Sequence, residues 1–201
     1  MVRRSVLSLC VLLGLLASAS TSHAYFSTID TGEMVPKGKY QVSVEPQIIF
    51  NEFDGFNVVG RFDTGINADS SARVLLGVGK VDYQVGGFYK YVPFPDTSNQ
   101  PAIGGSVGMV LARANGVTMT SIRFQPLVSK KFETEIGDLI PYASLPLGIT
   151  FTTNQTTMPV QLVVGSELRP LNMKDLSFFA ELGLNVTKAF GYVSGAIAYR
   201  F

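Results

Sequence analysis

Hydrophobic and polar residues alternate along most of this chain. In "YQVSVEPQIIF" (residues 40–50), the even positions from Tyr40 to Phe50 are apolar, whereas the odd positions include Gln41 and Glu45. A period of two is that of a β-strand with two unlike faces. The last residues, "GYVSGAIAYRF", keep the alternation and end on Phe201. The pattern therefore predicts strands that are apolar on one face and polar on the other.

About ten segments follow this period, and turn-forming sequences separate them. They cover residues 40–50, 56–67, 71–79, 83–91, 103–111, 117–125, 139–151, 160–167, 176–186 and 191–201. Asn115–Gly116 is the strongest hairpin signal, because both central residues of the favoured two-residue turn have positive φ. Pro126 indicates a bulge or a strand end, and segment 139–151 is the least regular because it contains two prolines. With no helical segment, the sequence predicts an all-β antiparallel meander of about ten strands, with eight or twelve left open.

The first 24 residues have a different pattern. Arg3 and Arg4 precede an apolar run over residues 6–17, and small residues lead to Ala24. This arrangement predicts a secretory signal peptide that is cleaved before Tyr25, with cleavage after Ala19 as a second choice. The run is too short for a spanning helix, which needs roughly 20 residues. We therefore expect a signal peptide over 1–24, an N-terminal leader over 25–37 and a single β-domain over 38–201.

Composition narrows the class of protein. Loss of the signal peptide removes Arg3, Arg4 and the only cysteine and histidine, so 16 basic residues become 14 against 15 acidic ones, a net charge of −1. A chain with this balance has no basic surface for a nucleic-acid partner. Disulfides, cysteine nucleophiles and thiolate or imidazole metal sites are likewise not expected. No cofactor is predicted.

Three features favour a membrane barrel over a soluble β-domain. The strands are longer than the roughly 5 to 6 residues usual in globular proteins and suit tilted strands that cross a bilayer. The signal peptide exports the chain. Aromatic residues also recur near segment ends, as at membrane interfaces. A soluble periplasmic β-domain that binds an apolar ligand stays open as the alternative.

The C-terminal residues resemble a known signature. A final Phe201, with Tyr199 and Ile197 at every second position before it, resembles the ending of bacterial outer-membrane β-barrel proteins. The resemblance implies an up-and-down transmembrane barrel in the bacterial outer membrane, in contact with its lipid. It also implies that Ile197, Tyr199 and Phe201 carry an insertion signal read by the barrel-assembly machinery. An even strand count leaves both ends in the periplasm, and the longer connections then also lie there, which is the reverse of the family's habit.

The sequence gives little support to an enzyme. "DTG", the loop signature of aspartic proteases, occurs at 30–32 and at 63–65, but that chemistry needs two aspartates that share one proton. The first copy lies in the leader, and in the second Asp63 shares a strand face with Arg61, which predicts an ion pair. Known barrel enzymes depend on a histidine, and the mature chain lacks one. The prediction is a protein without enzymatic activity.

Charged residues on the polar strand faces are expected to line the lumen and pair there. This predicted network consists of Glu45, Arg61, Asp63, Arg73, Asp82, Lys90, Arg123, Glu167, Glu181 and Arg200. It would either plug the lumen or line a narrow channel for small solutes or ions with weak selectivity. The sequence thus predicts a narrow passive pore or a structural element of the membrane, and an interaction or adhesion barrel remains an alternative.

Overall fold

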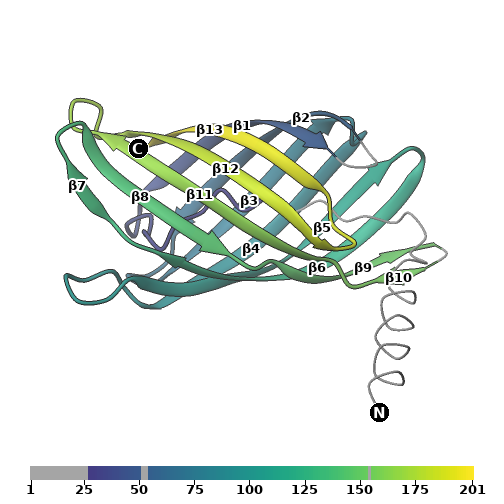
Figure 1. The fold of residues 1–201 in the computed structure, drawn as a ribbon, viewed down its shortest axis with the longest axis horizontal. Helices are drawn as coiled ribbons and strands as arrows, with labels where there is room; N and C mark the ends of the chain where they lie inside the picture. Colours follow the sequence, from purple (N-terminus) through teal and green to yellow (C-terminus); the bar gives the residue numbers. More distant parts are fainter. Residues whose placement is uncertain (1–26, 51–53, 154) are drawn as a thin grey trace, which may run out of the picture.

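The computed structural model describes residues 27–50, 54–153 and 155–201, and it shows a closed antiparallel β-barrel (Figure 1). The predicted signal peptide lies outside the described residues. The strands are β1 (Tyr40–Phe50), β2 (Gly55–Gly65), β3 (Ser70–Gly79), β4 (Tyr83–Phe94), β5 (Ala102–Ala114), β6 (Val117–Ser129), β7 (Phe132–Thr134), β8 (Gly137–Ser144), β9 (Leu147–Thr152), β10 (Thr156–Thr157), β11 (Val160–Pro170), β12 (Leu176–Thr187) and β13 (Gly191–Arg200).

Each wall strand pairs with the next one along the chain, and β13 pairs back onto β1. Tyr40 and Phe201 complete this seam, because each donates its backbone N–H to the other's carbonyl at 2.9 Å. Closure leaves the wall without a free edge, which is what a sheet in lipid requires. The predicted ten-stranded up-and-down barrel is confirmed.

One wall strand is built from two pieces. β8 and β9 together fill the place between β6 and β11, and the break between them falls at Leu145 and Pro146. Proline has no N–H to donate, so the ladder is bridged by Leu145 N to Pro126 O (3.2 Å) and by Gln161 N to Pro146 O (3.0 Å). The irregularity expected at Pro126 therefore lies on the neighbouring strand. β6 itself runs through Pro126 to Ser129.

The two ends of the barrel differ. We call the end that carries Tyr40 and Phe201 the terminal end and the opposite one the distal end. Connections at the terminal end are long (66–69, 95–101, 130–136 and 171–175), whereas those at the distal end include 80–82, 115–116 and 188–190. Asn115 and Gly116 both have positive φ (51° and 78°), which confirms the predicted hairpin turn. The long connections thus lie at the end that carries both strand termini of the barrel, as the sequence predicted.

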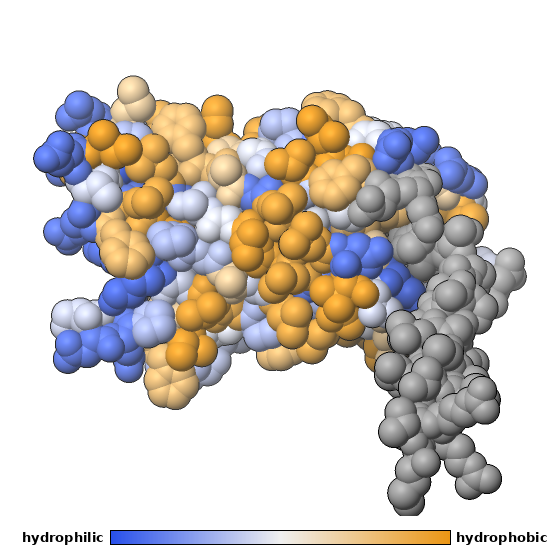
Figure 2. Space-filling view, viewed as in Figure 1, coloured by the Kyte–Doolittle hydropathy of each residue, from blue (hydrophilic) through white to orange (hydrophobic). Residues whose placement is uncertain are grey.

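Apolar side chains point outward and polar ones inward. Val44, Leu76 and Ile197 are each more than half exposed, while Glu45 and Gln47 are completely buried. Figure 2 shows hydrophobic side chains across the middle of the visible face and hydrophilic ones gathered at its left end, the terminal end. A soluble β-domain would have the opposite arrangement. The exterior therefore faces lipid, and the alternative of a soluble domain is wrong.

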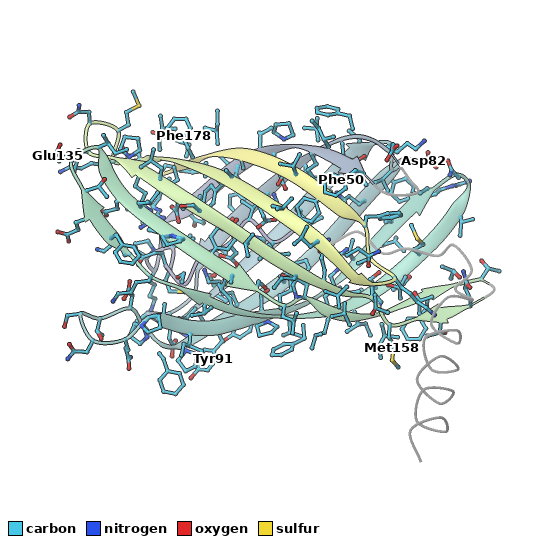
Figure 3. The ribbon with its side chains drawn as sticks, viewed as in Figure 1. Phe50, Asp82, Tyr91, Glu135, Met158 and Phe178 are labelled. Carbon is cyan, nitrogen blue, oxygen red and sulfur yellow. The ribbon has the colours of Figure 1, made fainter. Side chains whose placement is uncertain are left out.

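Aromatic rings mark the terminal end of this apolar surface. The ring of Tyr40 lies 5.6 Å from that of Phe62 and 5.8 Å from that of Phe201, and Tyr199 lies 6.1 Å from Phe201. Tyr91 and Phe178, which Figure 3 labels on opposite sides of the same end, also point outward. Such rings are typical of the boundary between hydrocarbon and headgroups.

The terminal connection 95–101 is fixed by Asp96. Its carboxylate accepts hydrogen bonds from Lys130 Nζ (2.7 Å) and from the backbone N–H of Lys131 (2.6 Å). Partial burial raises the pKa of Asp96, but these hydrogen bonds and the charges of both lysines outweigh it, so the pKa lies below its ordinary value. Asp96 is therefore an anion that joins two neighbouring connections.

A lysine on the lipid face tests the assignment of the two faces. Leu182 lies near the middle of β12, opposite Val193 and Val164, and points outward. We expect Leu182→Lys to lower the free energy of unfolding in lipid vesicles by about 2 to 4 kcal/mol. Ile136→Lys, in an exposed terminal turn, is the matched control and should cost less than about 1 kcal/mol. Equal costs for the two variants would contradict the assignment.

Candidate functional site

The leader enters the barrel. Residues 27–32 are all buried inside the lumen, and Figure 1 shows this purple segment within the left half of the ribbon. At the terminal end the chain turns back into β1, with Lys39 N donating to Pro36 O at 2.9 Å and Gly38 at φ 76°. A glycine with positive φ at the third position of a four-residue turn is typical of a type II turn. The leader thus runs from the middle of the lumen to its terminal mouth.

Glu181 on β12 holds the deepest part of the leader. Its carboxylate accepts the backbone N–H groups of Thr28 (2.9 Å) and Ile29 (2.6 Å). The hydroxyls of Tyr142 and Tyr192 donate to the same carboxylate. Four donors from the leader and the wall therefore converge on one buried anion, an arrangement of strong charge-assisted hydrogen bonds.

Ile29 is the apolar anchor of the leader. Its side chain is 2% exposed and belongs to a buried cluster with wall residues. The wall contributes Leu127, Tyr142, Val163, Phe179, Ala196 and Ala198. Ile29 has φ 37°, which is unfavourable for a β-branched residue and costs of the order of 1 to 3 kcal/mol. The hydrogen bonds to Glu181 and the apolar contacts hold this strained residue in place.

Wall cations bind the rest of the leader. Lys90 Nζ donates to Asp30 Oδ1 (2.7 Å) and to the carbonyls of Thr31 (2.6 Å) and Glu33 (2.8 Å). Arg169 Nη1 lies 3.0 Å from Glu33 Oε2. Within the described part of the chain, all three hydrogen bonds of Lys90 go to the leader. Lys90 therefore depends on the leader for its partners.

Hydroxyl and amide groups fix the remaining leader positions. Ser27 Oγ donates to Glu45 Oε2 at 3.0 Å and also contacts Arg61 and Gln47. Thr31 Oγ1 donates to Glu167 Oε2 (2.9 Å), and Gly32 N donates to Ser129 Oγ (2.8 Å). These contacts reach strands on opposite sides of the barrel, so the leader spans the cross-section of the lumen.

Both "DTG" sequences lie where the leader meets the wall. A Cβ atom on Gly32 would come within 2.3 Å of Ala102 Cβ, and one on Gly65 within 2.3 Å of Val35 O. Both aspartates face the Arg73 guanidinium, with Asp63 at 2.6 Å and Asp30 at 3.6 Å. Each carboxylate is thus neutralised by a cation, an arrangement that leaves no shared proton of the aspartic-protease type.

The expected ion pair between Asp63 and Arg61 is wrong. Asp63 pairs with Arg73, its direct neighbour on β3, and Arg61 pairs with Glu45 on β1. Asp63 and Arg73 are direct cross-strand partners, which brings their side chains together.

The structure places most of the predicted network around the lumen. Glu45, Arg61, Asp63, Lys90, Arg123, Glu167 and Glu181 are buried, and Arg73 and Arg200 are half-buried beside the leader. Asp82 is a correction: it lies in the exposed distal turn between β3 and β4, as Figure 3 shows, because the alternation does not continue through a turn. Ile197, Tyr199 and Phe201 lie exposed at the end of the β13 segment.

Three charged residues of the site were missed from the sequence: Asp30, Glu33 and Arg169. The first two belong to the leader, which the pattern places before the first strand, and Arg169 lies in the predicted connection "RPLNMKD". A usable signal was present, since residues 27–36 contain two acids and no base. An acidic segment beside a lumen with basic residues indicates a plug.

The leader packs against the wall. A cavity of about 20 Å³ lies among them, enough for roughly one water molecule. Toward the distal end, the apolar cluster of Val59, Leu75, Phe88 and Val110 covers the inner face of β2–β5. The leader and this cluster thus occupy different parts of the lumen.

Among the described residues, no group of three or more His, Cys, Asp or Glu residues is placed to hold a metal ion. No helix in the same part of the chain has the length and apolar character to cross a membrane.

Changing Glu181 tests how the leader is held. In Glu181→Gln, one acceptor oxygen becomes a donor, so the N–H groups of Thr28 and Ile29 can no longer both be bonded. An unsatisfied buried donor costs about 1 to 3 kcal/mol, so hydrogen exchange at these two amides should become roughly tenfold faster or more. Glu133→Gln, on exposed β7, is the control. Unchanged exchange in Glu181→Gln would contradict this arrangement.

The chain was compared with known proteins. No family model and no curated protein sequence matches it. Among solved structures, the β domain of the Bordetella autotransporter BrkA is similar at 15% identity and a TM-score of 0.50, covering 82% of this chain and 98% of that one. The translocator domain of the autotransporter NalP from Neisseria meningitidis shares 12% identity with a TM-score of 0.47, covering 100% and 95%. A designed transmembrane β-barrel shares 16% identity with a TM-score of 0.41, covering 84% and 100%.

The BrkA β domain shares its barrel fold with this chain. That fold and the apolar exterior described above agree with each other and with the C-terminal signature. The chain therefore has the fold of a transmembrane β-barrel.

Proposed function

We propose that this protein is a non-enzymatic, integral barrel of the bacterial outer membrane whose lumen is closed by its own leader. Its role is then that of a structural membrane element, and it conducts no solute in this state. The observation that carries the proposal is the leader itself, which crosses the lumen and is bonded to β1, β2, β3, β4, β6, β11 and β12.

The contacts of the leader favour a closed lumen over an open pore. Its two acids are ion-paired, its first amides are bonded to Glu181, and Ile29 is buried in apolar contacts. The cavity beside it has room for roughly one water molecule. A passive pore needs a continuous water path, which a segment held in this way interrupts.

Other classes of function have less support. The only histidine, His23, belongs to the predicted signal peptide, and both "DTG" aspartates are paired with cations. An adhesion barrel would present long segments outside the membrane, whereas distal connections such as 115–116 are tight turns. These observations favour a membrane element without catalytic or adhesive chemistry of its own.

Electrical recording tests the closed lumen. We expect mature protein, refolded in detergent and inserted into a planar lipid bilayer, to give no conductance steps in molar KCl. Resistance of the inserted barrel to protease in vesicles would show that it is folded. A porin added to the same membrane would show that the recording detects channels. Reproducible steps from the wild-type protein would refute the proposal.

We also propose that Phe201 carries an insertion signal for the barrel-assembly machinery. Its backbone already seals the β1–β13 seam, so Phe201→Ala is a better test than deletion because it keeps those two hydrogen bonds. We expect a several-fold lower level in the outer membrane with refolding in detergent unchanged. Phe94→Ala, another exposed aromatic residue, is the matched control. Normal membrane levels of Phe201→Ala would exclude the signal.

A further inference from the structure

We infer that the terminal half of the lumen is an anion site which the leader's own Asp30 and Glu33 occupy, and that the barrel conducts small anions when the leader leaves. This inference rests on the proposed function, in which the leader closes the lumen. The chemical class of the ligand follows from the charges of the wall.

The wall around the leader carries an excess of cations. Of the charged wall residues that line the cavity beside the leader, four are basic and two are acidic, a net charge of +2. They are Arg73, Lys90, Arg169 and Arg200 against Asp63 and Glu167. Asp30 and Glu33 of the leader supply −2 and balance this charge. Deeper in the lumen, Arg61 and Arg123 are balanced by Glu45 and Glu181.

The cations differ in how much they need the leader. Arg73 and Arg169 each have a wall carboxylate, Asp63 and Glu167, both at 2.6 Å. Lys90 instead binds Asp30 and two leader carbonyls. Departure of the leader would therefore leave Lys90 as an ammonium group facing the lumen, where an anion could replace the Asp30 carboxylate.

The leader can leave without opening the wall. Between residues 27 and 36 it belongs to no strand, and its bridge to the sheet is at Lys37 and Gly65. The ladder from β1 round to β13 is complete by itself. Release would also relieve the positive φ of Ile29. The leader is thus bound like a ligand, through side chains and its own backbone polar groups.

Buried polar groups continue from the leader toward the distal end, where they meet a second apolar cluster of Ile49, Phe190 and Tyr192. Gln47 Oε1, Asn57 Nδ2, Gln161 Oε1 and Ser194 Oγ are buried and have no hydrogen-bond partner among the described residues. Buried polar atoms of this kind are ordinarily hydrated. They lie on β1, β2, β11 and β13, whereas the apolar cluster of Val59, Leu75, Phe88 and Val110 lies on β2–β5. We expect the water path of the released state to follow these polar groups between the two apolar clusters.

The charge excess predicts a direction of selectivity. With the leader in place, acidic and basic residues around the cavity are equal in number. With the leader out, the +2 wall at the terminal mouth attracts anions and repels cations. The released barrel should therefore prefer chloride to potassium.

The test uses full-length variants in planar bilayers. Asp30→Lys with Glu33→Lys places like charges beside Lys90 and Arg169, so the leader should be expelled. We expect conductance steps with a chloride-to-potassium permeability ratio of about three or more in a KCl gradient. Glu133→Lys with Glu135→Lys makes the same change of net charge on the exposed terminal hairpin, where Figure 3 shows Glu135, and should stay silent.

Further variants assign the selectivity and guard against misfolding. Adding Lys90→Gln and Arg169→Gln to the expelled-leader variant should abolish the chloride preference, which separates the wall charges from the new leader lysines. If Asp30→Lys with Glu33→Lys does not fold, Asp30→Asn with Glu33→Gln removes the same ion pairs, and we expect rarer openings with the same preference.

Each outcome separates the two proposals. Silence of a folded, inserted expelled-leader or neutralised-leader variant would overturn the anion pore and leave the closed barrel standing. Conductance without chloride preference, or a preference that survives loss of the wall cations, would overturn the anion site. Steps from the wild-type protein would overturn the closed barrel itself.

Discussion

Closure of the sheet is the constraint on which the rest of this structure depends. Lipid offers no hydrogen bonds to a backbone, so a spanning sheet has to pair its first strand with its last. Here the Tyr40–Phe201 pair and the β1–β13 ladder close the ring. Closure sends every second side chain into an enclosed lumen, and the alternation of the strands makes that lumen polar. The interior therefore contains charges that each need a partner.

The leader supplies partners that the wall lacks. Glu45 and Arg61, Asp63 and Arg73, and Glu167 and Arg169 satisfy one another across or along the strands. Lys90 and Glu181 are different, because Lys90 binds leader oxygens and Glu181 binds leader N–H groups besides two tyrosines. Since an uncompensated buried charge is strongly destabilising, these two residues couple the closed lumen to the folded leader.

The sequence predicted the wall much better than its contents. Strand number, parity and the Asn115–Gly116 turn follow from local patterns, and all are confirmed by the structure. The choice of ion-pair partner does not follow from local patterns. Asp63 pairs with Arg73 on the neighbouring strand, and the register between two strands is a property of the assembled sheet. The prediction that Asp82 lines the lumen was wrong for a related reason, because the alternation of faces does not continue through a turn. The position of the leader could not be deduced from alternation, since residues 27–36 form no strand.

The two "DTG" sequences show how one motif can have a meaning other than the chemistry it resembles. In both, the glycine allows the leader backbone to pass against the wall, and the aspartate faces Arg73. Arg73 is therefore shared by a carboxylate that stays in the wall and one that belongs to the leader. Because Asp63 at 2.6 Å already satisfies Arg73, the more distant contact with Asp30 at 3.6 Å is the weaker of the two. Asp30 is therefore held mainly by Lys90, at 2.7 Å, and retention of the leader depends on this ion pair, on the hydrogen bonds to Glu181 and on the buried side chain of Ile29.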